Sequence, residues 1–298
     1  MSNLYLVFIC LLLGLLFQRL KQFPENAASV LNTYVIYVAL PALILNELPK
    51  AVLDQRALIL VFIAWVVMTF AACITFFTAK YLRWSRPVTG AMLLVVTLGN
   101  TGFVGIPLIE AHLGGSAIPY AILYDQFGTF LALNTFGVLI ASIYSGSSKN
   151  IKSISLNIIK FPPFVALCCT FALMPFGYPQ WLSDVLPRLA STLVPVVMVA
   201  VGLQWKLRLE REYLAPMGIA LIFILLLQPA FALIITKLFG LNGLAGHSIV
   251  LEAAMPAMIS AGVLATAHNL APRLAASIVG YSLALSLATV WIWRILIA

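Results

Sequence analysis

Apolar stretches long enough to cross a lipid bilayer recur along almost the whole chain. A helix needs about 20 apolar residues to span the hydrocarbon core, and its backbone groups must be satisfied within the helix because lipid offers no partners. The sequence therefore predicts an all-α membrane protein with ten transmembrane helices. The stretches are 3–18, 27–46, 57–79, 88–112, 118–144, 157–175, 181–203, 213–238, 245–268 and 272–296.

Composition excludes a water-soluble globule. The chain is 63% hydrophobic and 9% charged, whereas soluble domains contain about 25% charged residues. Folded in water, such a chain would expose far more apolar surface than soluble proteins do. Its net charge of +8 comes from basic residues scattered over short loops, a pattern that does not favour nucleic acid. The lipid bilayer is the expected partner.

The basic residues also orient the chain, because cytoplasmic loops of membrane proteins are enriched in Lys and Arg. With both termini on the non-cytoplasmic side, most of the 17 basic residues fall in cytoplasmic loops. We therefore predict a multi-pass protein of the cell (inner) membrane with both termini outside the cytoplasm. The residues assigned to the cytoplasmic side are Arg19, Lys21, Lys80, Arg83, Arg86, Lys149, Lys152, Lys160, Lys206, Arg208, Arg211 and Arg273.

The most polar loop, Gly146 to Asn150, divides the ten stretches five and five. An odd number of spans per half means that the second half enters the membrane from the opposite side. Two similar halves would then form an inverted repeat, as in many secondary transporters. We predict a first five-helix repeat over 1–145, a cytoplasmic linker over 146–156 and a second five-helix repeat over 157–298.

Two of the apolar stretches are interrupted, one in each half, at 97–107 and 252–262. The interruptions combine glycine, proline, asparagine and an acid, which cost free energy in a lipid-spanning helix unless protein, water or ligand satisfies them. Broken spans at matching positions of two halves are the best sequence indication of a carrier's binding site. The sequence therefore predicts a secondary active transporter whose fourth and ninth helices break at the site.

The broken helices predict a site for a carboxylate. The N-terminal end of a half-helix offers free N–H groups and a partial positive charge, both of which favour an anion. We expect Asn100 to be the principal carboxylate contact; the alternative is an amide that only packs helices by bonding to neighbouring backbone. The residues expected to bind substrate are Asn100, Thr101, Gly102, Pro256, Met258, Ser260 and Gln126.

Acids inside membrane spans are expensive and by default functional. Glu252 lies one turn before Pro256, and Asp125 lies in the fifth stretch with Thr129 one turn further on. We expect these three residues to couple transport to a cation or a proton. The alternatives are a Glu252 near the water interface and an Asp125 that only reaches a water-filled cavity. Near Gln228-Pro229 in the eighth stretch, we expect a kink whose free backbone group the glutamine satisfies.

The string Asn100-Thr101-x-x-x-Gly105-Ile106-Pro107-Leu108 resembles the fourth span of the auxin efflux carrier family, which includes plant PIN exporters and bacterial malonate-type carriers. The break at Pro256 resembles the ninth-span crossover of that family. The segments 195–202 and 40–43 are similar to its seventh and second spans, so the resemblance covers almost the whole chain. Gly99 departs from the plant pattern, which has proline there.

The resemblance implies two inverted five-helix repeats in which helices 4 and 9 unwind and cross near the bilayer centre. Helices 1, 2, 6 and 7 would form a scaffold and helices 3–5 and 8–10 a transport domain, with a homodimer formed through the scaffold. The substrate would be a small organic anion such as malonate or an auxin-like acid. The ninth stretch also resembles the related sodium–bile acid symporters through Glu252 and Met255, with Pro256 in place of a glutamine, which leaves a sodium ion at Glu252 as an alternative.

Other classes of function are less well supported. The chain contains neither a His-Glu-x-x-His nor a Gly-x-Gly-Asp motif, and nothing marks Asp125 and Glu252 as a hydrolytic pair. We therefore expect no enzyme activity and no cofactor beyond Na⁺ or H⁺ as a coupling ion. A channel or a receptor-like membrane protein is the remaining alternative. The sequence does not distinguish import from export.

Overall fold

The computed structural model describes residues 2–24, 26–50, 55–146, 160–174, 176–205 and 211–297. Across these ranges the chain is helical and forms no strand; two residues make one isolated backbone bridge. The expected all-α class is confirmed. Most of the expected linker at 146–156 lies outside the described residues.

Within the described residues, six helical segments are long and apolar enough to cross a membrane. Shorter apolar helices occur at Tyr5–Phe17, Arg86–Thr97, Thr101–Leu113 and Pro162–Leu173. Each of the ten expected ranges contains helix, while the count of ten membrane crossings stays a prediction. The six long segments are Ala27–Lys50, Ala57–Tyr81, Gly115–Ser145, Gln180–Gln204, Arg211–Leu238 and Pro272–Leu296.

The chain divides into two compact units. Unit 1 consists of Met1–Val52, Gly102–Ile122 and Leu156–Trp205, and unit 2 of Leu53–Thr101, Leu123–Ser155 and Lys206–Ala298. Each unit draws on both halves of the chain. The two units therefore do not correspond to the two expected repeats, which divide the chain at its middle. The boundaries of the repeats stay a prediction.

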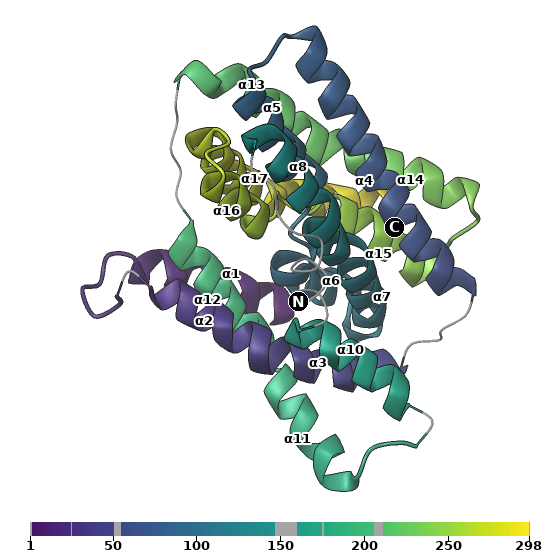
Figure 1. Ribbon diagram of the computed structural model, residues 1–298. Helices are drawn as coiled ribbons and strands as arrows, with labels where there is room; N and C mark the ends of the chain where they lie inside the picture. The colour runs from purple at the N-terminus through teal and green to yellow at the C-terminus, as the bar shows by residue number, and fades with distance from the viewer. Residues whose placement is uncertain are drawn as a thin grey trace. The chain divides into compact units, whose positions relative to one another are not determined.

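Unit 1 is built from short helices that pack in pairs, α1 with α12, α2 with α12, and α3 with both α10 and α11 (Figure 1). α7 (Ile118–Tyr124) lies across the division between the units. The helices of unit 1 are α1 (Ser2–Phe17), α2 (Ala27–Tyr34), α3 (Leu40–Glu47), α6 (Ile106–Leu113), α10 (Pro162–Leu173), α11 (Gln180–Ala190) and α12 (Leu193–Gln204), with a π-turn η1 (Val35–Ala39) and 3₁₀ turns η2 (Leu48–Lys50) and η4 (Gly115–Ala117).

Two glycines bring α1 and α12 into backbone contact. A Cβ atom on Gly14 would lie 2.3 Å from the carbonyl oxygen of Val199, and one on Gly202 would lie 2.4 Å from that of Leu11. Small residues at such crossings let two membrane helices approach closely. Gln18 reinforces the contact, because its Nε2 donates to the carbonyl oxygen of Gly202 at 2.7 Å.

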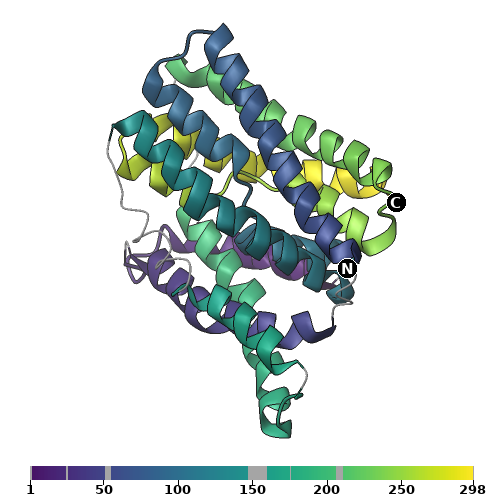
Figure 2. The ribbon, with the colours of Figure 1, turned by 45° about the vertical axis from the view of Figure 1, so that its right-hand side comes forward.

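Unit 2 contains the 27-residue helix α4 (Gln55–Tyr81), and the shorter α14 (Gln228–Leu238) packs beside it in both views (Figures 1 and 2). The π-turn η3 (Thr101–Gly105) begins in this unit and continues into unit 1. The elements of unit 2 are α4 (Gln55–Tyr81), α5 (Arg86–Thr97), η5 (Asp125–Phe130), η6 (Leu133–Gly137), α8 (Val138–Ser145), η7 (Arg211–Tyr213), α13 (Leu214–Ile222), η8 (Phe223–Leu227), α14 (Gln228–Leu238), α15 (Gly243–Ala253), α16 (Ile259–Ala267) and α17 (Pro272–Leu296).

The core of unit 2 surrounds α5. Every residue of this helix from Thr89 to Thr97 is buried, and α4, α8, α16 and α17 pack against it. A helix that is buried on all sides needs small and apolar residues around its whole circumference, as the run from Gly90 to Val96 provides. The packing places the C-terminal end of α5, where the first interruption begins, inside unit 2.

The eighth stretch differs in detail from the expected kink. Pro229 has no N–H group, so it cannot bond the carbonyl of Leu225 one turn earlier. The indole of Trp293 donates to that carbonyl at 2.9 Å, and the π-turn η8 accommodates the local change in winding. Gln228 Nε2 instead donates to the carbonyl of Val96 at 2.8 Å. The glutamine therefore ties α14 to the last turn of α5 rather than satisfying its own helix.

Candidate functional site

Both expected interruptions are present as breaks in helical structure. α5 ends at Thr97, and the next helical turn, η3, begins at Thr101. α15 ends at Ala253, and α16 begins at Ile259. The three non-helical residues of the first break and the five of the second leave backbone groups that no helix satisfies.

The two breaks pair with each other through their backbones. Asn100 N donates to the carbonyl oxygen of Pro256 at 2.7 Å, and Met258 N donates to that of Leu98 at 2.8 Å. This is the exchange of bonds found in an antiparallel ladder. Two stretches far apart in sequence therefore satisfy one another inside unit 2, where lipid could not satisfy them.

Between these bonds, Gly99 and Ala257 form the single antiparallel bridge of the described chain. Ser282 of α17 supports the crossing, since its Oγ accepts a hydrogen bond from Ala257 N at 3.0 Å. A Cβ atom on Gly99 would meet its nearest neighbours, side-chain atoms of Thr101 and Met255, at no less than 3.7 Å. A Cβ atom at this position would therefore make only ordinary van der Waals contacts.

A polar cluster gathers around Asp125, which is 5% exposed at the start of η5. Thr101 Oγ1 donates to Asp125 Oδ1 at 2.6 Å, and Gln126 Nε2 donates to Asp125 Oδ2 at 2.7 Å. The hydroxyls of Thr101 and Thr129 are also hydrogen-bonded to each other. The structure therefore brings together four of the residues that the sequence singled out, on a π-turn of the kind that is frequent at functional sites.

Asn100 directly precedes Thr101 in the chain and is 3% exposed. Its backbone N–H is used in the crossing, whereas its side-chain amide makes no hydrogen bond with any residue that the structure describes. Asn134 of η6 behaves differently, because its Nδ2 donates to the carbonyl of Phe130 one turn earlier at 2.9 Å. The amide of Asn134 is thus satisfied within its own helical segment, and the amide of Asn100 is available to another partner.

Glu252 is the most isolated polar side chain of the site. It is 1% exposed on α15, and neither of its carboxyl oxygens has a hydrogen-bond partner among the described residues. Gln126 Oε1 and Ser248 Oγ are likewise buried without a partner there. Ser248 lies one turn before Glu252 and so on the same face of α15. Asp125 is close enough to Glu252 for the two carboxyl groups to interact electrostatically.

The remaining predicted residues have mixed surroundings. Pro256 and Gly102 are buried, Met258 is half-buried, and Ser260 is exposed in the first turn of α16. Gly102 belongs to unit 1 and the other three to unit 2. Sequence reasoning missed Ser248 and Ser282, because a serine in an apolar helix is common; the spacing of four residues before Glu252 was the one available signal for Ser248.

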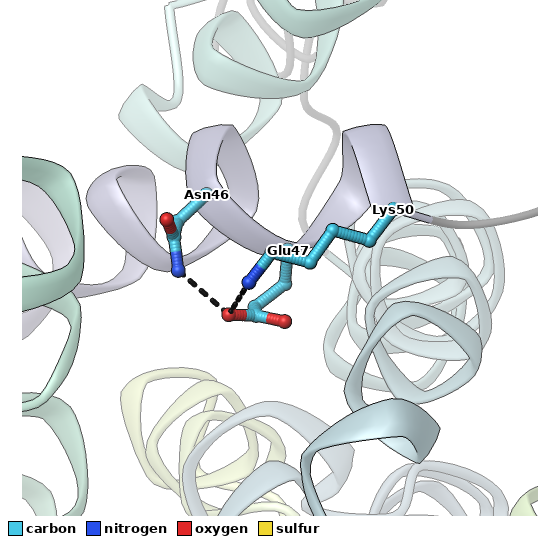
Figure 3. Close-up of polar contacts among 3 residues, drawn as sticks. All are labelled: Asn46, Glu47 and Lys50. Carbon is cyan, nitrogen blue, oxygen red and sulfur yellow. Dashed lines mark hydrogen bonds and ion pairs between the residues drawn. The ribbon is translucent and has the colours of Figure 1, made fainter. Parts of the chain in front are cut away.

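Unit 1 holds a separate cavity of about 300 Å³ with a polar wall. Glu47 on this wall accepts hydrogen bonds from Asn46 Nδ2 at 2.6 Å and from Lys50 Nζ at 2.7 Å (Figure 3). Glu110 of α6 lines the same cavity. Unlike the carboxyl of Glu252, that of Glu47 already has its charge matched by a lysine.

Comparison with known proteins identifies the chain as a membrane transporter. The sequence profile of the membrane transport protein family matches residues 1–294. Uncharacterized transporters of Methanocaldococcus jannaschii and Methanothermobacter thermautotrophicus are each 29% identical to it, over 98% of this chain and 97% and 96% of their own. A protein of Rhizobium meliloti whose name proposes malonate transport is 27% identical over 93% of this chain and 89% of its own. The chain therefore belongs to the membrane transport protein family, the family of the auxin efflux carriers that its sequence resembles.

Proposed function

We propose that the protein is a secondary active transporter of a small organic anion, a carboxylate such as malonate or an auxin-like acid. The observation that carries this proposal is the backbone pairing of Leu98–Asn100 with Pro256–Met258, next to an asparagine amide that no described residue occupies. The name of the Rhizobium meliloti relative supports the substrate class. Substrate contacts would come from Asn100, Thr101, Gly102, Gln126, Pro256, Met258 and Ser260.

The chemistry of the breaks suits a carboxylate better than a cation or a neutral solute. Asn100 Nδ2 would donate to one carboxylate oxygen. The first N–H groups of α16, at Ile259 and Ser260, have no acceptor within their own helix and carry the positive end of its dipole. The hydroxyl of Ser260 is exposed at the same helix start. Such donors hold an anion without an arginine.

Transport would follow alternating access, in which the domain that carries both breaks moves against a scaffold. Ten membrane-crossing helices in two inverted repeats, with both termini outside the cytoplasm and a homodimer formed through the scaffold, complete the proposal. The composition of unit 1 supports the scaffold, because this unit contains the helices of the first, second, sixth and seventh stretches.

Coupling to Na⁺ or H⁺ would involve Glu252, Asp125 and Thr129. Sodium-coupled symport of the bile-acid type is the second candidate, favoured by the unpartnered carboxyl of Glu252.

Counterflow in proteoliposomes tests whether the protein is a carrier. Purified protein is reconstituted with unlabelled malonate inside the vesicles, and labelled malonate is added outside. A carrier is expected to take up label faster when the vesicles are preloaded, because loaded carriers return faster than empty ones. A screen of other mono- and dicarboxylates by thermal shift would identify a better substrate if malonate binds weakly. If the rate of uptake of labelled malonate is the same with and without unlabelled malonate inside the vesicles, the protein would be a channel instead.

A further inference from the structure

The two buried acids of the site differ sharply in their hydrogen bonding. Asp125 accepts one hydrogen bond on each carboxyl oxygen, from Thr101 and from Gln126, whereas Glu252 accepts none from the described residues. Donors on both oxygens stabilise an ionised carboxylate. A buried carboxylate with no donor and no counter-ion is strongly disfavoured. The surroundings therefore assign the fixed negative charge to Asp125 and leave Glu252 to be neutralised.

We propose that Glu252 carries a proton in this conformation and exchanges it once per transport cycle. Transport of the carboxylate substrate is thereby coupled to proton transfer. This proposal rests on the proposed function and adds two details to it: the coupling ion is H⁺, and the residue that holds it is Glu252. When Glu252 is released to water, its O–H bond breaks, the electron pair stays on the carboxylate, and the proton passes to a water molecule. The reverse step reloads the site.

Two other unpartnered polar atoms of unit 2 suit a protonated Glu252 better than an ionised one. Gln126 uses its Nε2 on Asp125, and its Oε1 is left buried as an acceptor without a donor. A proton on Glu252 creates a donor of the kind that this acceptor lacks. Ser248, on the same face of α15, adds a hydroxyl that can donate or accept.

Few other charges bear on Glu252. Asp125 and Tyr124 both interact electrostatically with Glu252. α15 packs against α4, α14 and α17 and itself carries the half-buried His247. On those three helices the titratable side chains that the structure describes are the exposed Cys73, Lys80, Tyr81, Lys237 and Arg273 and the half-buried Tyr281 and Arg294.

The test measures proton movement and malonate exchange separately, in proteoliposomes that contain a pH-sensitive dye. For the wild type, adding malonate outside is expected to change the internal pH, beyond the change in protein-free vesicles. Glu252→Gln, which mimics the neutral acid, is expected to keep malonate counterflow and the malonate-induced thermal shift but to lose the pH change. Glu212→Gln, at the exposed start of η7, is the matched control and should behave as the wild type does.

Each alternative has its own signature. Wild-type counterflow without a pH change, or with uptake of labelled Na⁺ instead, would overturn the proton assignment and leave the carrier intact. The absence of counterflow in the wild type would contradict the proposed function itself. Infrared spectroscopy provides a readout that does not depend on transport: the carbonyl band of a protonated carboxyl should be present in the wild type and lost in Glu252→Gln. A spectrum that is the same in both proteins would also overturn the assignment.

Discussion

At the scale of single residues, the site depends on which polar side chains already have partners. Thr101 and Gln126 each donate a hydrogen bond to Asp125, whereas Asn100 and Glu252 offer side-chain groups that no described residue occupies. In a membrane protein an unsatisfied buried group costs free energy, so a function that uses it must compensate. The hydrogen bonds to Asp125 therefore hold the site in shape, and the unpartnered groups of Asn100 and Glu252 are the first candidates for binding a substrate or a proton.

Replacing Asn100 should weaken substrate binding without unfolding the protein. Asn100→Ala removes a donor to a charged carboxylate, worth about 1.5–3 kcal/mol, which corresponds to a loss of affinity of roughly 10- to 100-fold. Titration of the purified protein with malonate measures the change. Asn134→Ala, which removes an amide that donates within its own helical segment, is the control and should bind as the wild type does. Equal affinity in the two variants would remove Asn100 from the site.

Replacing Thr101 should reduce stability instead. Thr101→Val keeps the shape of the side chain but removes the hydroxyl that donates to Asp125. A buried carboxylate that loses a donor costs about 1–3 kcal/mol, so the melting temperature in detergent should fall. Thr135→Val is the matched control, because that exposed hydroxyl bonds only the carbonyl of Leu131 in its own helix. If the two variants have the same melting temperature, the hydrogen bond from Thr101 to Asp125 contributes nothing to stability.

At the scale of elements, the crossing in unit 2 and the contact between α1 and α12 in unit 1 both depend on close backbone approach. The sequence predicted both breaks correctly, because glycine, proline and asparagine stand out within apolar stretches. It could not predict their register, in which Asn100 bonds Pro256 and Met258 bonds Leu98. That register depends on how α5 and α15 approach each other in space. The bond from Gln228 to Val96 was missed for the same reason.

The contact between α1 and α12 gives a test at this scale. Gly202→Ala would place a Cβ atom 2.4 Å from the carbonyl oxygen of Leu11 and 2.8 Å from the Cα of Gly14. Two helix backbones would have to separate, and such overpacking typically costs about 1–3 kcal/mol. Gly218→Ala on α13, where nothing lies within 4 Å of the new Cβ atom, should be neutral or slightly stabilising. The comparison of melting temperatures would contradict the account if Gly202→Ala were as stable as Gly218→Ala.

At the scale of the whole molecule, the helical class and the membrane transporter family follow from the sequence, and the structure and the family match confirm them. Polar residues in an apolar chain are few, so Asn100, Asp125 and Glu252 are conspicuous in the amino-acid sequence. Ser248 and Ser282 are not, because small hydroxyls are compatible with any membrane helix. The division into units 1 and 2 is also invisible in the sequence, since each unit combines distant segments.

The orientation in the membrane is a prediction that one labelling experiment can check. The basic residues place the loop at 146–152 on the cytoplasmic side. In a variant without Cys10, Cys73, Cys168 and Cys169, Ser148→Cys should react with a membrane-impermeant maleimide only in inside-out vesicles. Labelling of intact cells would reverse the orientation of the whole chain.

The most direct measurement of the central claim is a density map of the protein with a bound carboxylate substrate. We expect density for the carboxylate between the side chain of Asn100 and the start of α16, beside the paired backbones of Leu98–Asn100 and Pro256–Met258. Density in the cavity of unit 1 beside Glu47, with nothing at the crossing, would contradict it.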